Sequence, residues 1–253
     1  MVIVQSLWVG PELSQLEIYS IKSYLKTGHT FHLYTYEKVK KVPKGVIIKD
    51  GNKIIPKKEL FDFKSSYLPF SDIFRYKLLY EKGDYWVDMD MIALRKLDFE
   101  EPFVFSSERT IQKGAYKNSK PYVANIGVLK APPKSEFYKE LYEKCIKQTK
   151  ITENIQFMRI MRKLVDKYNY HKYVKGPKLF CPLDWWHAKE AFYPPCCSSK
   201  YGVRGYSVTS ILRNSYSVHF WRSIVTNKRK IDVNQKFDEK SLWERCKKYV
   251  DEY

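Results

Sequence analysis

The sequence predicts an α/β fold in which one mostly parallel sheet is covered by helices. Short runs rich in β-branched and aromatic residues alternate along the chain with longer segments of helical apolar spacing. The 253 residues are 44% hydrophobic, which is enough to bury one sizeable core. No internal repeat or linker-like stretch divides the sequence. We therefore expect a single domain over residues 1–253.

Strands are predicted where a short apolar run is bounded by polar or turn-forming residues. The run Val2-Ile3-Val4 opens the first strand, and Lys-rich turns separate the next two. The predicted strands cover residues 2–7, 31–36, 45–48, 85–88, 103–106, 122–130 and 216–220.

Helices are predicted from apolar spacing and from capping residues. Pro11 suits a first helical position, Ser71 an N-cap and Gly83 a C-terminal cap. The stretch 187–215 carries no periodic pattern and is expected to be loop-rich. The predicted helices cover residues 11–26, 71–82, 134–148, 152–168 and 239–250.

Two carboxylates follow the predicted strand 85–88. Side chains alternate in an extended segment, so Asp88 and Asp90 would project to the same side. Such an oxygen-rich pair suits Mg²⁺ or Mn²⁺. The preceding helix brings Asp72 and Arg75 to this edge, where open α/β sheets bind ligands. Taken alone, an Asp-x-Asp pair is equally typical of solvated carboxylates in a turn.

A series of short motifs spans nearly the whole chain in a fixed order. They are IVQSLWVG at 3–10, FSDIFRYKLLYEKGDYWVDMD at 70–90, LDF at 97–99, PFVF at 102–105, ANIGV at 124–128, FCPLDWW at 180–186 and SVHFW at 217–221. Together they resemble the glycosyltransferases of the GT-A fold with a DXD sugar-binding region. More specifically, they resemble glycosyltransferase family 32 and its relatives among capsule-sugar transferases and large clostridial glucosylating toxins.

The resemblance implies a role for each candidate in the first half of the chain. Trp8 would offer its ring to the nucleotide base. Asp72 and Arg75 would hold the donor sugar and its diphosphate, since a guanidinium matches phosphate and vicinal hydroxyls. Asp88 would reach the ribose and sugar hydroxyls and assist the metal shell. Asp90 would ligate the metal directly.

Four candidates lie further along the chain. His219 is the third candidate metal ligand, and Trp221, which alternation would place on the same face as His219, would help to close the donor site. Asn125 would contact the sugar or the reaction centre. Asp184, which precedes two tryptophans, would meet the acceptor.

Three positions depart from the family pattern. Gln5 stands where relatives often carry His, and Asp84 stands where they usually carry a second Gly. Residues 154–158 replace a Gly-Pro-containing segment that shapes the active-site wall, so the acceptor cannot be carried over.

The implied activity is metal-dependent transfer of a sugar from a nucleotide-sugar, most consistently a UDP-sugar, to a glycan or other hydroxyl acceptor with retention. An alternative is a transferase-like module that binds sugar or nucleotide without turnover.

A formal net charge of +18 also raises the alternative of an RNA-binding protein, but the basic residues are spread along the chain and no nucleic-acid motif accompanies them. We therefore expect no specific nucleic-acid partner, although such a surface could associate with an anionic membrane or glycan.

The five cysteines include no C-x-x-C pair, and no signal-peptide pattern or bilayer-length apolar run is present. These features predict a reducing, cytoplasmic location.

Overall fold

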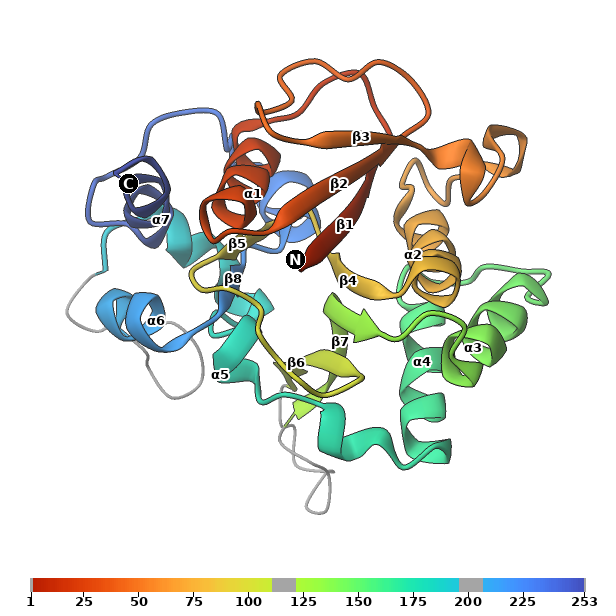
Figure 1. The fold of residues 1–253 in the computed structure, drawn as a ribbon. Coiled ribbons are helices and arrows are strands. Elements are labelled where there is room, and N and C mark those ends of the chain that lie inside the picture. The colour runs from red at the N-terminus through yellow and green to blue at the C-terminus, as the bar shows by residue number, and fades with distance from the viewer. Residues whose placement is uncertain (1, 111–121, 196–206, 253) are drawn as a thin grey trace.

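The structure is a computed structural model that describes residues 2–110, 122–195 and 207–252 (Figure 1). Cys196 and Cys197, which fall in the stretch 187–215 that is expected to be loop-rich, lie outside the described residues.

The centre of the fold is a six-stranded sheet with the order β3-β2-β1-β4-β7-β6. Strands β3, β2, β1 and β4 are mutually parallel, whereas β7 pairs antiparallel with both β4 and β6. The predicted mostly parallel α/β sheet is therefore confirmed. The strands are β1 (Ile3–Trp8), β2 (Thr30–Thr35), β3 (Ile47–Asp50), β4 (Asp84–Val87), β6 (Val104–Arg109) and β7 (Tyr122–Ala131).

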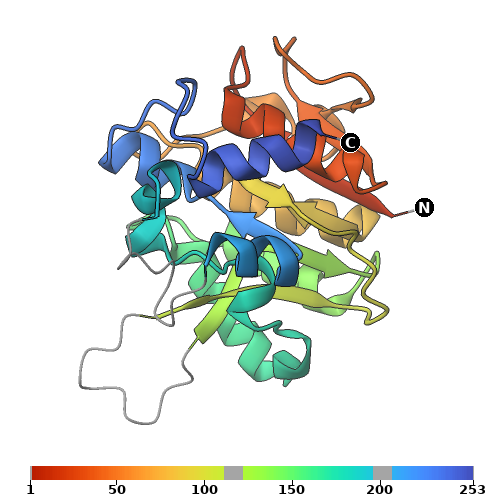
Figure 2. The same ribbon diagram turned by 90° about the vertical axis from the view of Figure 1, so that its left-hand side faces the viewer.

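Helices cover both faces of this sheet (Figures 1 and 2). On one side lie α2 (Leu68–Lys82), α3 (Glu136–Ile146) and α4 (Gln156–Lys167), and on the other lie α1 (Gln15–Lys26) and α7 (Leu242–Asp251). Strand β4 shows why two cores form. Its alternation sends Trp86 into the core with α2, and Tyr85 and Val87 into the core with α1.

The structure also contains a second sheet of two strands, of which only the strand near residues 216–220 was predicted. Strand β5 (Met91–Ala93) pairs antiparallel with β8 (Ser217–His219), and Met91 lies opposite His219. Strand β5 is only three residues long and follows a turn, so no periodic signal marks it in the sequence. Its pairing joins the middle of the chain to the C-terminal region.

Four predicted helix starts were wrong, two of them at α4, which begins at Gln156 and not 152, and at α7, which begins at Leu242 and not 239. Helix α1 begins at Gln15, not Pro11, because Ser14 and Glu17 form a reciprocal capping box. Helix α2 begins at Leu68, three residues before Ser71, with a proline in its first turn. The C-terminal cap at Gly83 is confirmed, with φ of +66°.

The stretch expected to be loop-rich contains regular structure. A 3-10 helix covers Trp185–Phe192 and α6 covers Val208–Asn214. A π-helical turn over Ser223–Lys228 follows β8. No helix in the described part of the chain is both long and apolar enough to span a bilayer. The remaining short elements are the 3-10 turns Gly51–Lys53, Lys57–Glu59 and Tyr170–Tyr173 and the helical turn α5 (Pro177–Phe180).

Candidate metal and donor site at the end of β4

The chain turns immediately after β4. The Asp88 backbone N–H donates to the Gly127 carbonyl at 2.8 Å, and the Asp88 carbonyl accepts from the Met91 N–H at 3.1 Å. The extended segment thus ends at Val87, and a turn, not strand alternation, brings Asp88 and Asp90 together. The expected convergence holds, but the geometry predicted for it was wrong.

His219 joins these two carboxylates through the pairing of β5 with β8. One ligand atom from each of Asp88, Asp90 and His219 lies within 4.8 Å of the others. Two carboxylates and an imidazole are a donor set that Mn²⁺ accepts, and Mg²⁺ less readily because it favours oxygen. These three residues could therefore hold a divalent ion. The Asp88 side chain is 22% exposed and leaves the cluster accessible from solvent.

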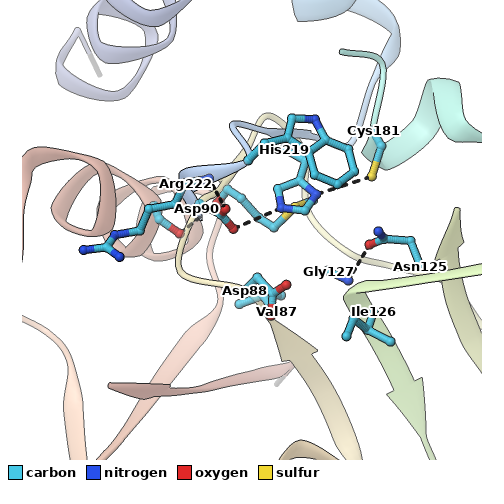
Figure 3. Close-up of polar contacts among 12 residues, drawn as sticks. Val87, Asp88, Asp90, Asn125, Ile126, Gly127, Cys181, His219 and Arg222 are labelled. Atoms are coloured by element: carbon cyan, nitrogen blue, oxygen red, sulfur yellow. Dashed lines mark hydrogen bonds and ion pairs between the residues drawn. The ribbon is translucent and has the colours of Figure 1, made fainter. Parts of the chain in front are cut away.

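Asp90 and His219 form an ion pair within this cluster (Figure 3). His219 Nε2 lies 3.2 Å from Asp90 Oδ1, and Asp90 Oδ2 accepts the Arg222 backbone N–H at 2.7 Å. Burial disfavours the charged forms of both side chains, but their mutual attraction outweighs this effect. This attraction places the pKa of Asp90 below its usual range and the pKa of His219 well above its own. A bound metal ion would have to displace the imidazole proton.

The His219 ring is held from two further directions. Cys181 Sγ lies 3.9 Å from Nδ1, and the Trp221 ring stacks on the imidazole with centroids 3.8 Å apart. Trp221 Nε1 donates to the Leu183 carbonyl at 2.9 Å. The structure therefore places Trp221, a predicted donor-site residue, against a candidate metal ligand with only 8% of its surface exposed.

Asp88 is held on its protein-facing side by a buried layer of three residues, Asp72, Arg75 and Trp86. Arg75 Nη1 donates to Asp88 Oδ1 and to the Ile126 carbonyl, both at 2.8 Å, and Nη2 lies 3.0 Å from Asp72. The Trp86 indole N–H donates to the same Asp88 oxygen at 2.9 Å. The structure thus places Asp72 and Arg75, predicted to face the donor, behind Asp88, where each is only 2% exposed.

Burial dominates the electrostatics of Asp72. It raises the pKa of this carboxyl from 3.8 to about 7, opposed by Arg75 and assisted by the charge of Asp88. One guanidinium therefore serves two carboxylates, and the better-exposed Asp88 forms the shorter pair.

Trp8 ends β1 at the same edge of the sheet, next to β4. The Arg222 guanidinium lies over its ring, 5.3 Å from the centroid. Arg222 also pairs with Glu17 of α1, with Nε 2.6 Å from Oε1. Sequence reasoning missed Glu17 and Arg222, although the capping box around Ser14 could have drawn attention to Glu17.

Asn125 lies near His219, and Asp184 pairs with a residue of β6. Asn125 Oδ1 accepts the Gly127 N–H at 2.7 Å, and its Nδ2 donates to Glu108 at 2.6 Å. A Cβ built on Gly127 would lie 3.5 Å from His219 Nδ1, so this strand edge closely approaches the imidazole (Figure 3). Asp184 is buried and pairs with Arg109 of β6 at 2.5 Å.

Two of the departures from the family pattern lie away from the cluster. Asp84 stands at the opposite end of β4 from Asp88, so it adds no acid to the site. Gln5 is buried within β1, where its Nε2 donates to the Gly83 carbonyl at 2.8 Å.

No family model and no curated protein matches this sequence. Among solved structures, the chain is similar to one described as "PaToxG Glycosyltransferase", with a TM-score of 0.47 and 12% sequence identity. The alignment covers 66% of this chain and 68% of that one. At these values the likeness assigns no activity to this chain.

Proposed function

We propose that this chain is a glycosyltransferase that moves a sugar from a UDP-sugar to a hydroxyl of a glycan or another acceptor. Asp88, Asp90 and His219 would hold Mn²⁺ or Mg²⁺. The observation that carries the proposal is the convergence of these three side chains at the carboxyl end of β4. Ligands of open α/β sheets bind at that edge. The ordered motifs in the sequence support the same conclusion.

The donor would lie across the ends of β1 and β4. These strands are parallel neighbours, so Trp8 and Asp88 leave the sheet at the same edge. A base against Trp8 would thus place the diphosphate toward the metal cluster. A bound metal would neutralise charge on the leaving nucleoside diphosphate.

The side chains around the cluster would orient it. Arg75 and Trp86 both bind one oxygen of Asp88, which fixes the carboxylate plane and leaves its other oxygen to ligate. His219 is held by Trp221. Because these supports are buried and rigid, the ligands would need little rearrangement on binding.

The acceptor would approach from the side of β6 and β7. Asn125 lies beside His219, and Asp184 precedes Trp185 and Trp186, whose rings can stack on sugars. We expect retention, with front-face attack by the acceptor hydroxyl and transfer of its proton to the departing phosphate. A net charge of +18 would favour an anionic glycan or membrane surface nearby. We place the protein in the cytoplasm and expect no specific nucleic-acid partner.

The first test is thermal stability against nucleotides and nucleotide-sugars, with and without Mn²⁺. A ligand at about 100 times its Kd stabilises the folded state by about 2.7 kcal/mol, which for a chain of this size raises the Tm by about 5–10 °C. Release of free sugar from the stabilising donor would then be measured chromatographically. Shifts without any donor hydrolysis would indicate a binding module.

Three matched variants sharpen the test. Asp88→Asn and Asp90→Asn should abolish Mn²⁺-dependent donor turnover. Asp84→Asn changes a carboxylate at the far end of the same strand and should leave turnover unchanged. Metal-dependent turnover that survives both Asp88→Asn and Asp90→Asn would refute the proposal.

A further inference from the structure

The turn that follows β8 has an unusual backbone. Trp221 adopts φ of +55°, a conformation that large side chains rarely take. Such a residue persists only where its surroundings fix it. Its own ring is fixed by the Leu183 carbonyl and by the stack on His219.

This turn determines how Asp90 lies. The Phe220 backbone N–H donates to the Asp90 carbonyl at 2.9 Å, and the Arg222 N–H donates to Asp90 Oδ2 at 2.7 Å. His219 takes the other carboxylate oxygen. The position of the Arg222 backbone is therefore part of the geometry of the candidate metal site.

The Arg222 side chain extends to the far side of Asp90, away from His219 (Figure 3). There its Nε meets Oε1 of Glu17, which is completely buried, at 2.6 Å. The other Glu17 oxygen accepts from the Ser14 N–H at 2.8 Å and from the Ser14 hydroxyl at 2.5 Å. Glu17 thus ties the turn to the N-terminus of helix α1.

A capping role alone does not explain a charged residue here. Gln serves the third position of a capping box as well as Glu does, without the cost of burying a carboxylate. The contact of Glu17 that a neutral amide would not reproduce is its ion pair with Arg222. The guanidinium also covers Trp8, so the pair links the proposed base platform to the proposed metal ligand.

We propose that Glu17 and Arg222 are positioning residues of the metal site. Glu17 anchors the Arg222 side chain, and the anchored Arg222 holds its backbone N–H on Asp90. The inference rests on the proposed function in one respect only, that Asp88, Asp90 and His219 bind a divalent ion.

The test measures Mn²⁺ affinity of the purified chain, from the electron paramagnetic resonance signal of free Mn²⁺, with and without UDP. Glu17→Gln keeps the capping box and removes the charge that holds Arg222. Groups that orient metal ligands typically change metal affinity about 10- to 100-fold, so we expect Glu17→Gln and Arg222→Gln to weaken Mn²⁺ binding at least about 10-fold. The double variant should bind Mn²⁺ with the same affinity as either single variant, because each substitution removes the same Glu17–Arg222 ion pair.

Ser14→Ala is the matched control. It removes the hydroxyl of the capping box and should lower the Tm, but it leaves the Glu17–Arg222 pair in place. Its Mn²⁺ affinity should equal that of the wild type. Wild-type affinity in Glu17→Gln and Arg222→Gln, or an equal loss in Ser14→Ala, would overturn the inference. A wild-type chain that binds no Mn²⁺, or whose binding survives Asp90→Asn, would instead overturn the proposed metal site.

Discussion

Asp72 offers a quantitative test of the buried layer behind Asp88. Its side chain is 3% exposed, and its ion-pair partner Arg75 is shared with Asp88. Two effects compete at this carboxylate. Pairing with Arg75 at 3.0 Å favours the charged form, and burial favours the neutral form. Burial wins and raises the pKa from 3.8 to about 7.

The sign of the resulting pH dependence follows by linkage. The folded protein binds this proton more tightly than the unfolded chain, so the contribution of Asp72 to stability is complete below pH 3.8 and falls as the pH rises toward 7. Within that window each pH unit costs about 1.4 kcal/mol, or about 4 kcal/mol in total. Asn at this position resembles the neutral carboxyl and does not titrate. The unfolding free energy of Asp72→Asn should therefore rise relative to that of the wild type by about 1.4 kcal/mol for each pH unit in this window.

The assay is urea unfolding of the wild type and Asp72→Asn at several pH values between about 5 and 8. The difference in unfolding free energy should widen by about 1.4 kcal/mol per pH unit up to pH 7 and level off above it. Asp98→Asn, at an exposed carboxylate, is the control and should show a small, nearly constant difference. A difference that stays flat, or that favours the wild type more at high pH, would show that pairing with Arg75 outweighs burial.

Three other substitutions have expected outcomes. Trp86→Phe removes the indole donor to Asp88 and leaves a cavity at a fully buried side chain, so it should weaken Mn²⁺ binding about 10-fold, measured by titration, and also lower the Tm. Gly127→Ala places a methyl group 3.1 Å from both Met91 Sδ and Asn125 Oδ1, so these neighbours must shift beside His219, and Mn²⁺ binding measured by titration should weaken. Gly83→Ala combines φ of +66° with a Cβ 2.6 Å from a backbone nitrogen, so it should lower the unfolding free energy by about 2–3 kcal/mol without selective loss of metal affinity.

The sequence predicted the order of the main sheet elements because their signals are local. Short apolar runs and the cap at Gly83 each depend on a few adjacent residues. Helix starts were less predictable, because a suitable residue does not always serve as the N-cap. Ser14 caps α1, whereas Ser71 lies inside α2, and only the folded chain shows this difference. The boundaries of α1 and α2 moved for this reason.

The candidate site was predictable only in part. Asp88 and Asp90 are close in sequence, so their convergence could be expected, although the turn that achieves it could not. That Arg75 is buried behind Asp88 depends on how α2 packs on β4, which no spacing in the sequence specifies. The ion pair between Glu17 and Arg222 joins residues from opposite ends of the chain, and the capping box that marks Glu17 gives no indication of its partner.

The candidate metal ligands come from two segments that meet only through tertiary structure. Asp88 and Asp90 lie in the turn after β4, whereas His219 arrives through the short pairing of β5 with β8. A three-residue pairing is weak by itself, so the surrounding contacts must hold His219 in place. Trp221 and Asp90 are both buried: Trp221 stacks on the face of the imidazole, and Asp90, fixed by the Arg222 backbone N–H, pairs with its Nε2. Substitutions in this buried support should therefore alter Mn²⁺ affinity before they unfold the protein, which distinguishes a metal site built into the core from exposed carboxylates that happen to be close together.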